Sequence, residues 1–579
     1  MQNGGGDKYA KVQKRMKGFV IAGTGSGSGK TTITLGLLAY LSGLGYRVAP
    51  FKVGPDFIDP GHHTAVTGKI SRNLDSWMLS KETNERIFAK GCIGNIDIKC
   101  FNIAGGSISD FNKESFDKEF VDTVAEIADV AVVEGVMGLF DGYSGTSEAG
   151  STAQMAKWLH LPVVLVVDAR SMARSAAAIV QGFENFDPEI EFAGVIFSKT
   201  GSQRHYEYLK EAVEANCRMR CIGHLPRTPE IAMPERHLGL VTSDEHKLSS
   251  EVIAKIVDMI DKNTSIRAMV ESLPEYNLPD CRKIITLKSL SIIDTITDTT
   301  VIPPRNLRIA VARDKAFCFY YQENIEALEK YGAEIVEFSP IESKHLPPYI
   351  HGIYFGGGYP ELFAQQLSDN KGLMDEIRER SLQGMPIYGE CGGFMYLCRD
   401  IVTVIEPVAT ELDATATARG EWRERDLTLK DKGTEIDQLG KRYPMTGCFP
   451  FSAVMSKKMR SLGYRQITLK QDSLIGKMGD LLRGHEFHYS SLEDENMDNM
   501  LTENSKQGDN QIAEQGKLKR IYDTAGRDGQ EISLNGYQIN NTLGSYLHIH
   551  FESMEGGAAL TFVNCCREFC NLSESSIIV

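Results

Sequence analysis

One stretch of sequence decides the fold of the first half of the chain: Gly18-Phe19-Val20-Ile21-Ala22-Gly23-Thr24-Gly25-Ser26-Gly27-Ser28-Gly29-Lys30-Thr31-Thr32. Its apolar start predicts a buried strand, and a helical pattern follows from about Ile33 to Leu44. A strand, a glycine-rich loop, Gly-Lys-Thr and a helix are the context of a phosphate-binding loop. Backbone N–H groups of such a loop converge on phosphate oxygens, and the helix N-terminus adds its dipole. We therefore predict a nucleotide site on a parallel α/β sheet.

The residues that we expect to bind ATP lie mostly in this loop. They are Gly23, Thr24, Gly25, Gly27, Gly29, Lys30, Thr31 and Thr32. Lys30 is expected to reach the β- and γ-phosphates, and the Thr31 hydroxyl is placed to ligate Mg²⁺. The usual spacing would put the first glycine at Thr24, whereas Gly23 lies one residue further back.

Charged residues follow two further strands of the predicted sheet. The strand 47–53 contains Lys52 and leads into a turn with Asp56 and Asp59, and the strand 130–133 ends at Glu134. In open α/β sheets, ligands bind outside the carboxyl ends of the strands. We therefore expect Lys52 and Asp56 to contact nucleotide or substrate, and Thr31, Glu134 and Asp56 to hold Mg²⁺. Asp59 is a second acid of the same turn that could hold Mg²⁺ or orient substrate. Ordinary turn chemistry of Gly, Pro and Asp is the alternative for the loop after residue 53.

Strands and helices alternate along both halves of the chain. This rhythm predicts two doubly wound α/β domains. We expect an ATP-binding domain at 17–262, a linker at 263–304, a second domain at 305–579, and polar, solvated insertions at 411–443 and 503–531.

The composition excludes several classes of protein. A chain of 579 residues is too long for one core. Its net charge of -14 argues against a general nucleic-acid binder. No apolar run reaches the ~18 residues of a membrane span, and from the polar N-terminus we expect no secretory leader. Twelve cysteines are too few for a disulfide scaffold, so we expect reduced thiols and a cytoplasmic location.

A second stretch, Pro386–Leu397 (PIYGECGGFMYL), predicts a nucleophile on a sharp turn. An apolar run ends at Cys391, glycines flank the thiol, and a helix-like run follows. Glycines permit a strand-to-helix elbow, and the helix N-terminus favours a thiolate and an oxyanion. The three glycines 356–358, after another strand, could donate N–H groups to an oxyanion, although a tight turn also explains them. A buried cysteine in a β–α connection is the alternative for Cys391.

A thiol nucleophile needs a base. The chain has 13 histidines, so composition cannot choose among them. Residues 484–490 and 545–551 both contain histidines in a strand-like alternation. In the second segment, His548 and His550 would point to one face of a strand.

Taken together, these motifs resemble those of the cobyrinic acid a,c-diamide synthase family. The resemblance spans residues 17–562 apart from the linker and the two polar insertions. The motifs that carry it are residues 23–32, 52–60, 134–142, 234–240, 310–321, 354–361, 390–397, 483–490 and 545–551.

The resemblance implies an ATP domain similar to dethiobiotin synthetase, joined to a class I glutamine amidotransferase domain. In that family Cys391 would form a thioester with glutamine and release ammonia, with His548 as its base. Class I amidotransferases usually carry a Glu two residues after this histidine, where this chain has His550. The resemblance therefore implies a Cys–His pair and leaves open what orients His548.

The first domain would then use ATP and Mg²⁺ to phosphorylate carboxylates of a corrin precursor, which ammonia would amidate. Related enzymes act on hydrogenobyrinic acid or nickel-sirohydrochlorin, and the motifs do not separate these substrates. Family members often have Asn at the position of Ser198 to read adenine, so contacts to the base are left unassigned.

A regulatory ATPase similar to ParA or MinD is the alternative from a different class. Its phosphate loop usually has an extra lysine near the start, where Thr24 and Gly25 stand. It would also have no use for the Gly-Glu-Cys-Gly-Gly stretch.

Overall fold

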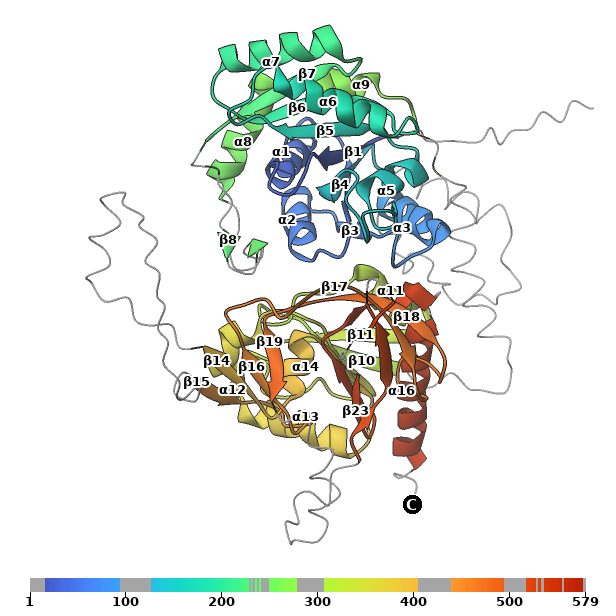
Figure 1. The fold of residues 1–579 in the computed structure, drawn as a ribbon. Helices are drawn as coiled ribbons and strands as arrows, with labels where there is room; N and C mark the ends of the chain where they lie inside the picture. The colour runs from blue at the N-terminus through green and yellow to red at the C-terminus, as the bar shows by residue number, and fades with distance from the viewer. Residues whose placement is uncertain are drawn as a thin grey trace, which may run out of the picture. The chain divides into compact units, whose positions relative to one another are not determined.

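The computed structural model describes residues 16–93, 127–228, 231, 235–236, 239–240, 249–276, 278, 307–404, 439–493, 517–526, 529–532, 536–554 and 557–575. The chain divides into two compact units, Met1–Pro303 with Tyr321–Glu326, and Pro304–Tyr320 with Ala327–Val579. Each unit is built on a sheet flanked by helices (Figure 1). In the described part of the chain, no helix is both long and apolar enough to cross a membrane.

The first unit contains a seven-stranded parallel sheet in the order β3-β2-β4-β1-β5-β6-β7. Its strands are β1 (Lys17–Gly23), β2 (Val48–Val53), β3 (Arg72–Leu74), β4 (Val130–Gly138), β5 (Val163–Asp168), β6 (Phe192–Thr200) and β7 (Cys221–Pro226). The order reverses on either side of β1, as in doubly wound folds. The predicted parallel α/β sheet is confirmed.

Helices cover both faces of this sheet (Figure 1). They are α1 (Lys30–Gly43), α2 (Ile58–Thr67), α3 (Lys81–Ile93), α5 (Thr152–Leu159), α6 (Ser175–Phe186), α7 (Gln203–Asn216), α8 (Ser250–Asn263) and α9 (Ile266–Ser272). In β5, Val164 and Val166 join one core with α1, α8 and α9, whereas Leu165 and Val167 join the other with α6 and α7. Side chains of a strand alternate between faces, so a strand that is apolar throughout is buried on both sides.

The structure differs from the expected linker at 263–304. Its beginning forms α9, whose Ile266, Met269 and Val270 pack into the core of the first unit. Apolar residues spaced three and four apart share one helix face, which explains this packing. Most of the remaining linker lies outside the described residues.

The second unit contains another seven-stranded sheet, in the order β11-β10-β12-β13-β24-β23-β20. Its strands are β10 (Leu307–Ala312), β11 (Ala333–Phe338), β12 (Gly352–Phe355), β13 (Ile387–Glu390), β20 (Lys519–Arg520), β23 (Tyr537–Ile539) and β24 (Thr542–Ser545). The pairs from β11 to β24 are parallel, and the last two are antiparallel. The second α/β fold is confirmed as well.

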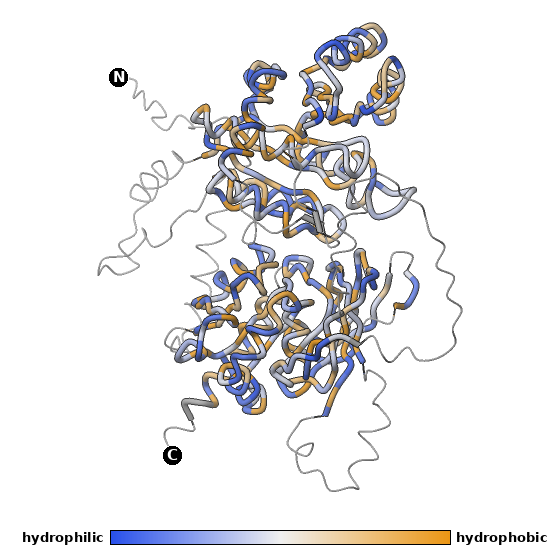
Figure 2. The backbone as a smooth tube through the Cα atoms, turned by 90° about the vertical axis from the view of Figure 1, so that its left-hand side faces the viewer, coloured by the Kyte–Doolittle hydropathy of each residue, from blue (hydrophilic) through white to orange (hydrophobic). Residues whose placement is uncertain are grey.

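Smaller sheets and further helices complete the second unit. The sheets combine β17 (Ser461–Leu469), β18 (Leu481–His488), β21 (Tyr522–Ala525), β22 (Glu531–Ile532) and β25 (His548–Ile549), and β14 (Asp400–Val404), β15 (Leu439–Pro444), β16 (Ser452–Met455) and β19 (Ser490–Glu493). The helices are α11 (Gln322–Lys330), which begins in the first unit, α12 (Ala364–Asp369), α13 (Lys371–Leu382), α14 (Gly392–Leu397) and α16 (Gly557–Ser575). Along the helices in Figure 2, hydrophobic and hydrophilic residues alternate as they do in amphipathic helices.

The predicted polar insertions differ in part from solvated loops. Residues 519–525 of the second insertion form β20 and β21, with Ile521 and Tyr522 fully buried between charged neighbours. Two apolar residues within a highly polar stretch are too weak a signal to predict a buried strand from the sequence. In the first insertion, β15 pairs with β14. The rest of 411–443 and residues 503–516 lie outside the described residues.

Candidate functional site

The predicted phosphate loop joins β1 to α1 in the first unit. Gly27 and Gly29 have φ angles of 72° and 93°, a left-handed conformation that glycine adopts without steric cost. The hydroxyl of Ser198, from β6, donates a hydrogen bond of 2.6 Å to the carbonyl of Ser28. This bond ties the loop to the sheet. Ser198, for which no contact to adenine was assigned from the sequence, therefore supports the phosphate loop.

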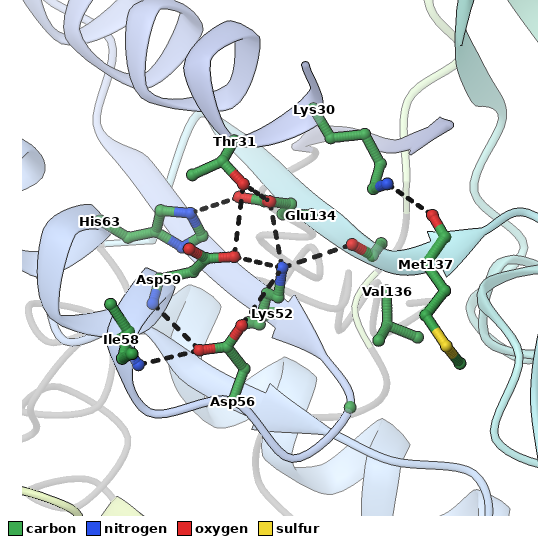
Figure 3. A network of polar contacts seen from close by, with 12 residues as sticks. Lys30, Thr31, Lys52, Asp56, Ile58, Asp59, His63, Glu134, Val136 and Met137 are labelled. Carbon is green, nitrogen blue, oxygen red and sulfur yellow. Dashed lines mark hydrogen bonds and ion pairs between the residues drawn. The ribbon is translucent and has the colours of Figure 1, made fainter. Parts of the chain in front are cut away.

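The ammonium of Lys30 lies within this loop (Figure 3). It donates hydrogen bonds to the carbonyls of Gly25, at 3.1 Å, and Met137. Burial, followed by the nearby charge of Lys52, lowers the pKa of Lys30 to about 8. The lysine is still charged at neutral pH, and its backbone acceptors are of the kind that phosphate oxygens could replace.

The start of the loop is hydrogen-bonded to neighbouring segments, and its end forms the first turn of α1. Gly23 accepts a hydrogen bond from the N–H of Leu139, and the N–H of Thr24 donates to Val166 of β5. Thr32 lies half-buried in the first turn of α1.

Lys52 lies at the centre of a cluster of three carboxylates, of which Asp59 and Glu134 are buried (Figure 3). It stands beside Glu134 in the β2–β4 ladder. Its Nζ is 3.0 Å from Glu134 Oε1, 2.5 Å from Asp59 Oδ2 and 3.7 Å from Asp56 Oδ2. Although burial lowers the pKa of Lys52, Asp59 and Glu134 together raise it above its usual value. The cluster therefore holds a permanent cation next to the phosphate loop.

Glu134 is also bound by two further side chains. The Thr31 hydroxyl donates to its Oε1 at 2.8 Å, and His63 Nε2 lies 2.8 Å from its Oε2. His63 in turn contacts the hydroxyl of Ser71 at 3.1 Å. Burial raises the pKa of Glu134, but Lys52 and His63 lower it below its usual range, so the carboxylate is ionised. No role for His63 is predicted from the sequence, although this residue follows the same strand end as Asp56 and Asp59.

The three predicted Mg²⁺ ligands are not equivalent in the structure. Thr31 and Glu134 present adjacent oxygens, which are the donors that Mg²⁺ prefers. Asp56 instead accepts hydrogen bonds from the N–H groups of Ile58 and Asp59 at the start of α2. The carboxylate of Asp59 lies 3.4 Å from Thr31 Oγ1. Among the described residues, no group of three His, Cys, Asp or Glu side chains is arranged to hold a metal ion.

Cys391 lies on a strained elbow between β13 and α14 in the second unit. Its φ and ψ angles are 49° and −105°, a conformation that costs a non-glycine residue about 1–3 kcal/mol. The N–H of Cys391 donates to the carbonyl of Ser545 on β24 at 2.8 Å. The sharp strand-to-helix turn expected from the sequence is thus present, and the Cys391 sulfur lies 4.0 Å from the carbonyl oxygen of Phe487 on β18.

The three-glycine loop after β12 lies against this elbow. A Cβ atom on Gly392 would lie 3.0 Å from the backbone nitrogen of Gly358. A Cβ atom on Gly357 would lie 2.3 Å from Cε1 of His548. Both positions therefore need glycine for close approach, and the loop packs against both the elbow and the imidazole.

We expect Gly357→Ala to impair use of glutamine selectively. The added methyl group would displace the His548 ring, because carbon atoms do not approach to 2.3 Å. Glutamine hydrolysis should fall by about 10²-fold. Gly372→Ala is a matched control, because a Cβ on this exposed residue of α13 meets nothing within 4 Å. Steady-state glutaminase assays on both variants check this prediction, and equal rates would contradict it.

His548 is brought to Cys391 by the antiparallel pairing of β25 with β18. Its partner in this ladder is His485, and the two rings stack with centroids 5.0 Å apart. His548 is 2% exposed. Burial lowers the pKa of His548, but the neighbouring Cys391 thiolate and Glu390 carboxylate raise it to about 9. A buried imidazole beside a thiol on an elbow is the geometry of an activated cysteine nucleophile.

Two family models together match most of the chain. Residues 19–241 match the CobQ/CobB/MinD/ParA nucleotide binding domain. Residues 308–416 and 428–556 match the CobB/CobQ-like glutamine amidotransferase domain.

The chain is also similar over nearly its whole length to curated proteins named cobyrinate a,c-diamide synthase. The protein from Leptospira interrogans (strain Fiocruz L1-130) is 35% identical, with 95% of this chain and 98% of its own length covered. The Dehalococcoides mccartyi protein is 36% identical, with 96% and 99% covered. Among solved structures, PurLQS from Thermotoga maritima aligns with 46% of this chain and 100% of its own, at 12% identity and a TM-score of 0.25.

Proposed function

This chain belongs to the cobyrinate a,c-diamide synthase family, and we propose that it amidates the a and c carboxylates of cobyrinic acid in cobalamin biosynthesis. ATP and glutamine would be its cosubstrates. One observation carries the proposal: the same polypeptide holds a phosphate-binding loop and an elbow cysteine beside a buried histidine. The first feature activates a carboxylate, and the second supplies ammonia.

In the second unit, the Cys391 thiolate attacks the side-chain amide carbon of glutamine. The resulting oxyanion collapses to a thioester as ammonia leaves with a proton from the imidazolium of His548. His548 then takes a proton from water, which hydrolyses the thioester to glutamate and restores the thiol. The backbone N–H groups of Gly358 and Gly392 are our candidates for stabilising the oxyanion, because the backbone of Gly358 lies close to Gly392, the residue after Cys391.

In the first unit, a corrin carboxylate attacks the γ-phosphorus of ATP and ADP leaves. Ammonia then attacks the acyl phosphate, inorganic phosphate leaves, and a proton is lost to give the amide. Lys30 and Lys52 are placed to neutralise charge on the phosphates and the carboxylate. Exclusion of water protects the acyl phosphate from hydrolysis. Two amidations require two rounds of this sequence.

Thr31 and Glu134 would hold Mg²⁺ in this unit, with Asp59 nearer to them than Asp56. The bound cation would neutralise phosphate charge during transfer. We place the reaction in the cytoplasm, where the thiol of Cys391 stays reduced.

The proposal is tested by one assay on the full chain. With ATP, Mg²⁺, glutamine and cobyrinic acid, we expect the mass to fall by about one unit for each carboxylate converted to an amide, giving a monoamide and then a diamide that mass spectrometry detects. Hydrogenobyrinic acid and nickel-sirohydrochlorin are the comparison substrates. Absence of amidation of cobyrinic acid with both glutamine and free ammonia would refute the proposal. A higher kcat/KM with a comparison substrate would replace the substrate and keep the reaction.

A further inference from the structure

A buried carboxylate stands directly before the nucleophile, and no step of the chemistry proposed above uses it. Glu390 is the last residue of β13 and is 1% exposed. Its Oε2 lies 3.8 Å from Nδ1 of His548. An ionised group in such a place is costly unless charge and hydrogen bonds compensate it.

Three donors hold this carboxylate in place. The hydroxyl of Tyr354 donates to Oε2 at 2.9 Å, and the hydroxyl of Tyr388 donates to Oε1 at 2.8 Å. The backbone N–H of Ile549, next to the histidine, also donates to Oε1 at 3.1 Å. Oε2 thus faces both one tyrosine and the imidazole, and the carboxylate is fixed from three different elements.

We propose that Glu390 is the positioning residue of His548, orienting its ring and stabilising its protonated form while glutamine is hydrolysed. This inference rests on the glutaminase chemistry proposed above. Position 550, two residues after His548, holds a histidine and cannot supply a carboxylate. The acid comes instead from the residue before Cys391, which the elbow turns toward the same site.

The orientation follows from which ring nitrogen faces the carboxylate. A proton on Nδ1 is favoured by a nearby carboxylate, which leaves Nε2 for the sulfur and the leaving amide. The distance of 3.8 Å is longer than a hydrogen bond and within the range of an ion pair. Glu390 therefore acts mainly when His548 is positively charged, which is the state that gives its proton to ammonia.

The groups around His548 come from several elements. They are Cys391 on the elbow, Glu390 on β13, His485 on β18 and His550 after β25. Burial, together with His548 and His550, holds the pKa of His485 well below its usual range, so His485 is neutral at neutral pH. Burial and the charge of Glu390 raise the pKa of Tyr388 well above its usual value, so this tyrosine stays a neutral donor.

Glu390→Gln tests the role by removing the charge and keeping the shape. We expect kcat for glutamine hydrolysis to fall by at least about 100-fold, with little change in KM. The imidazolium loses a stabilising charge, so its pKa falls and the alkaline limb of the kcat profile should move down by about one pH unit. Glu390→Asp should recover part of the rate. The rate of Cys391 alkylation by iodoacetamide against pH reports the thiolate that the imidazolium stabilises, and this measurement needs neither ATP nor corrin.

Two tyrosine variants give a second test that leaves the carboxylate in place. Tyr354→Phe removes the donor to Oε2, which concentrates charge on the oxygen that faces His548. The alkaline limb of the kcat profile of Tyr354→Phe should therefore move to higher pH, which is the opposite direction from Glu390→Gln. Tyr388→Phe removes a donor to Oε1 and should move the limb less. A merely structural role would not give shifts of opposite sign.

Glu486→Gln is the matched control for loss of a buried acid. Glu486 is 2% exposed, pairs with Arg465, and points to the opposite face of β18 from His485. The Glu486→Gln variant should have a lower melting temperature, and the alkaline limb of its kcat profile should not move.

Several outcomes overturn the inference. One is a Glu390→Gln variant that melts like the wild type and keeps its glutaminase rate and pH profile. If Glu390→Gln does not fold, the inference is overturned when both tyrosine variants keep the alkaline limb of the kcat profile at the wild-type pH. A wild-type chain that hydrolyses glutamine but does not amidate cobyrinic acid refutes the proposed substrate alone.

Discussion

Cys391→Ala should abolish the use of glutamine while amidation with free ammonia continues. The thiolate is the atom that bonds to glutamine, so its loss should lower glutamine-dependent amidation by at least about 10³-fold. Ammonia added to the solution bypasses this step and needs only the activated carboxylate. Alanine is smaller than cysteine, and the elbow strain at φ 49° remains for any residue with a Cβ. The measurement is the initial rate of corrin amidation with each nitrogen source.

Cys565→Ala serves as the control for this variant. Cys565 is a half-buried thiol on α16, outside the elbow, and its replacement should leave both rates unchanged. If Cys391→Ala melts like the wild type and also loses activity with ammonia, the assignment of ammonia production to the second unit alone is wrong.

Lys30→Ala should lose amidation with glutamine and with ammonia alike. The Lys30 ammonium is the cation held inside the phosphate loop, where it contacts the carbonyls of Gly25 and Met137. Removing one such electrostatic group from a transition state costs about 10²–10³-fold in rate. Both nitrogen sources depend on the acyl phosphate, so neither can bypass the defect. Rates of corrin-dependent ADP release measure the loss directly.

Lys69→Ala is the corresponding lysine control. Lys69 is exposed just after α2 in the same unit, and its replacement removes an equal charge from the surface. It should keep both activities. Normal ADP release by Lys30→Ala would show that the loop does not bind the transferring phosphate as proposed.

Local motifs predicted the conformation of these two segments well because each of them is one continuous turn. The phosphate loop and the elbow at Cys391 are both strand–turn–helix units whose conformation depends on nearby glycines. Such signals survive in the sequence because the residues that build the turn are neighbours in the chain. The choice of His548 came from the family resemblance, and β-sheet pairing is what carries its ring to the elbow.

Residues that act across strands could not be found in the same way. His63 reaches Glu134 from a helix, and Asp59, rather than Asp56, lies beside Thr31. A turn with two acids is compatible with either acid facing the site, since the direction of each side chain depends on how α2 begins. Asp56 accepts hydrogen bonds from the start of that helix and lies 3.7 Å from Lys52, whereas Asp59 lies 2.5 Å from the same lysine.

The sequence by itself determined that the chain has two α/β units, a phosphate loop at 23–32 and a thiol at a sharp turn at 391. Apolar periodicity and glycine spacing encode these features locally, whatever surrounds them. Only the tertiary structure decided which charges meet: Lys52 with Glu134, and Glu390 with His548. Those pairs are set by strand order and register, which bring together residues that are 82 and 158 positions apart. Because a buried charge needs a partner at hand, register rather than local sequence selects the residues that complete each site.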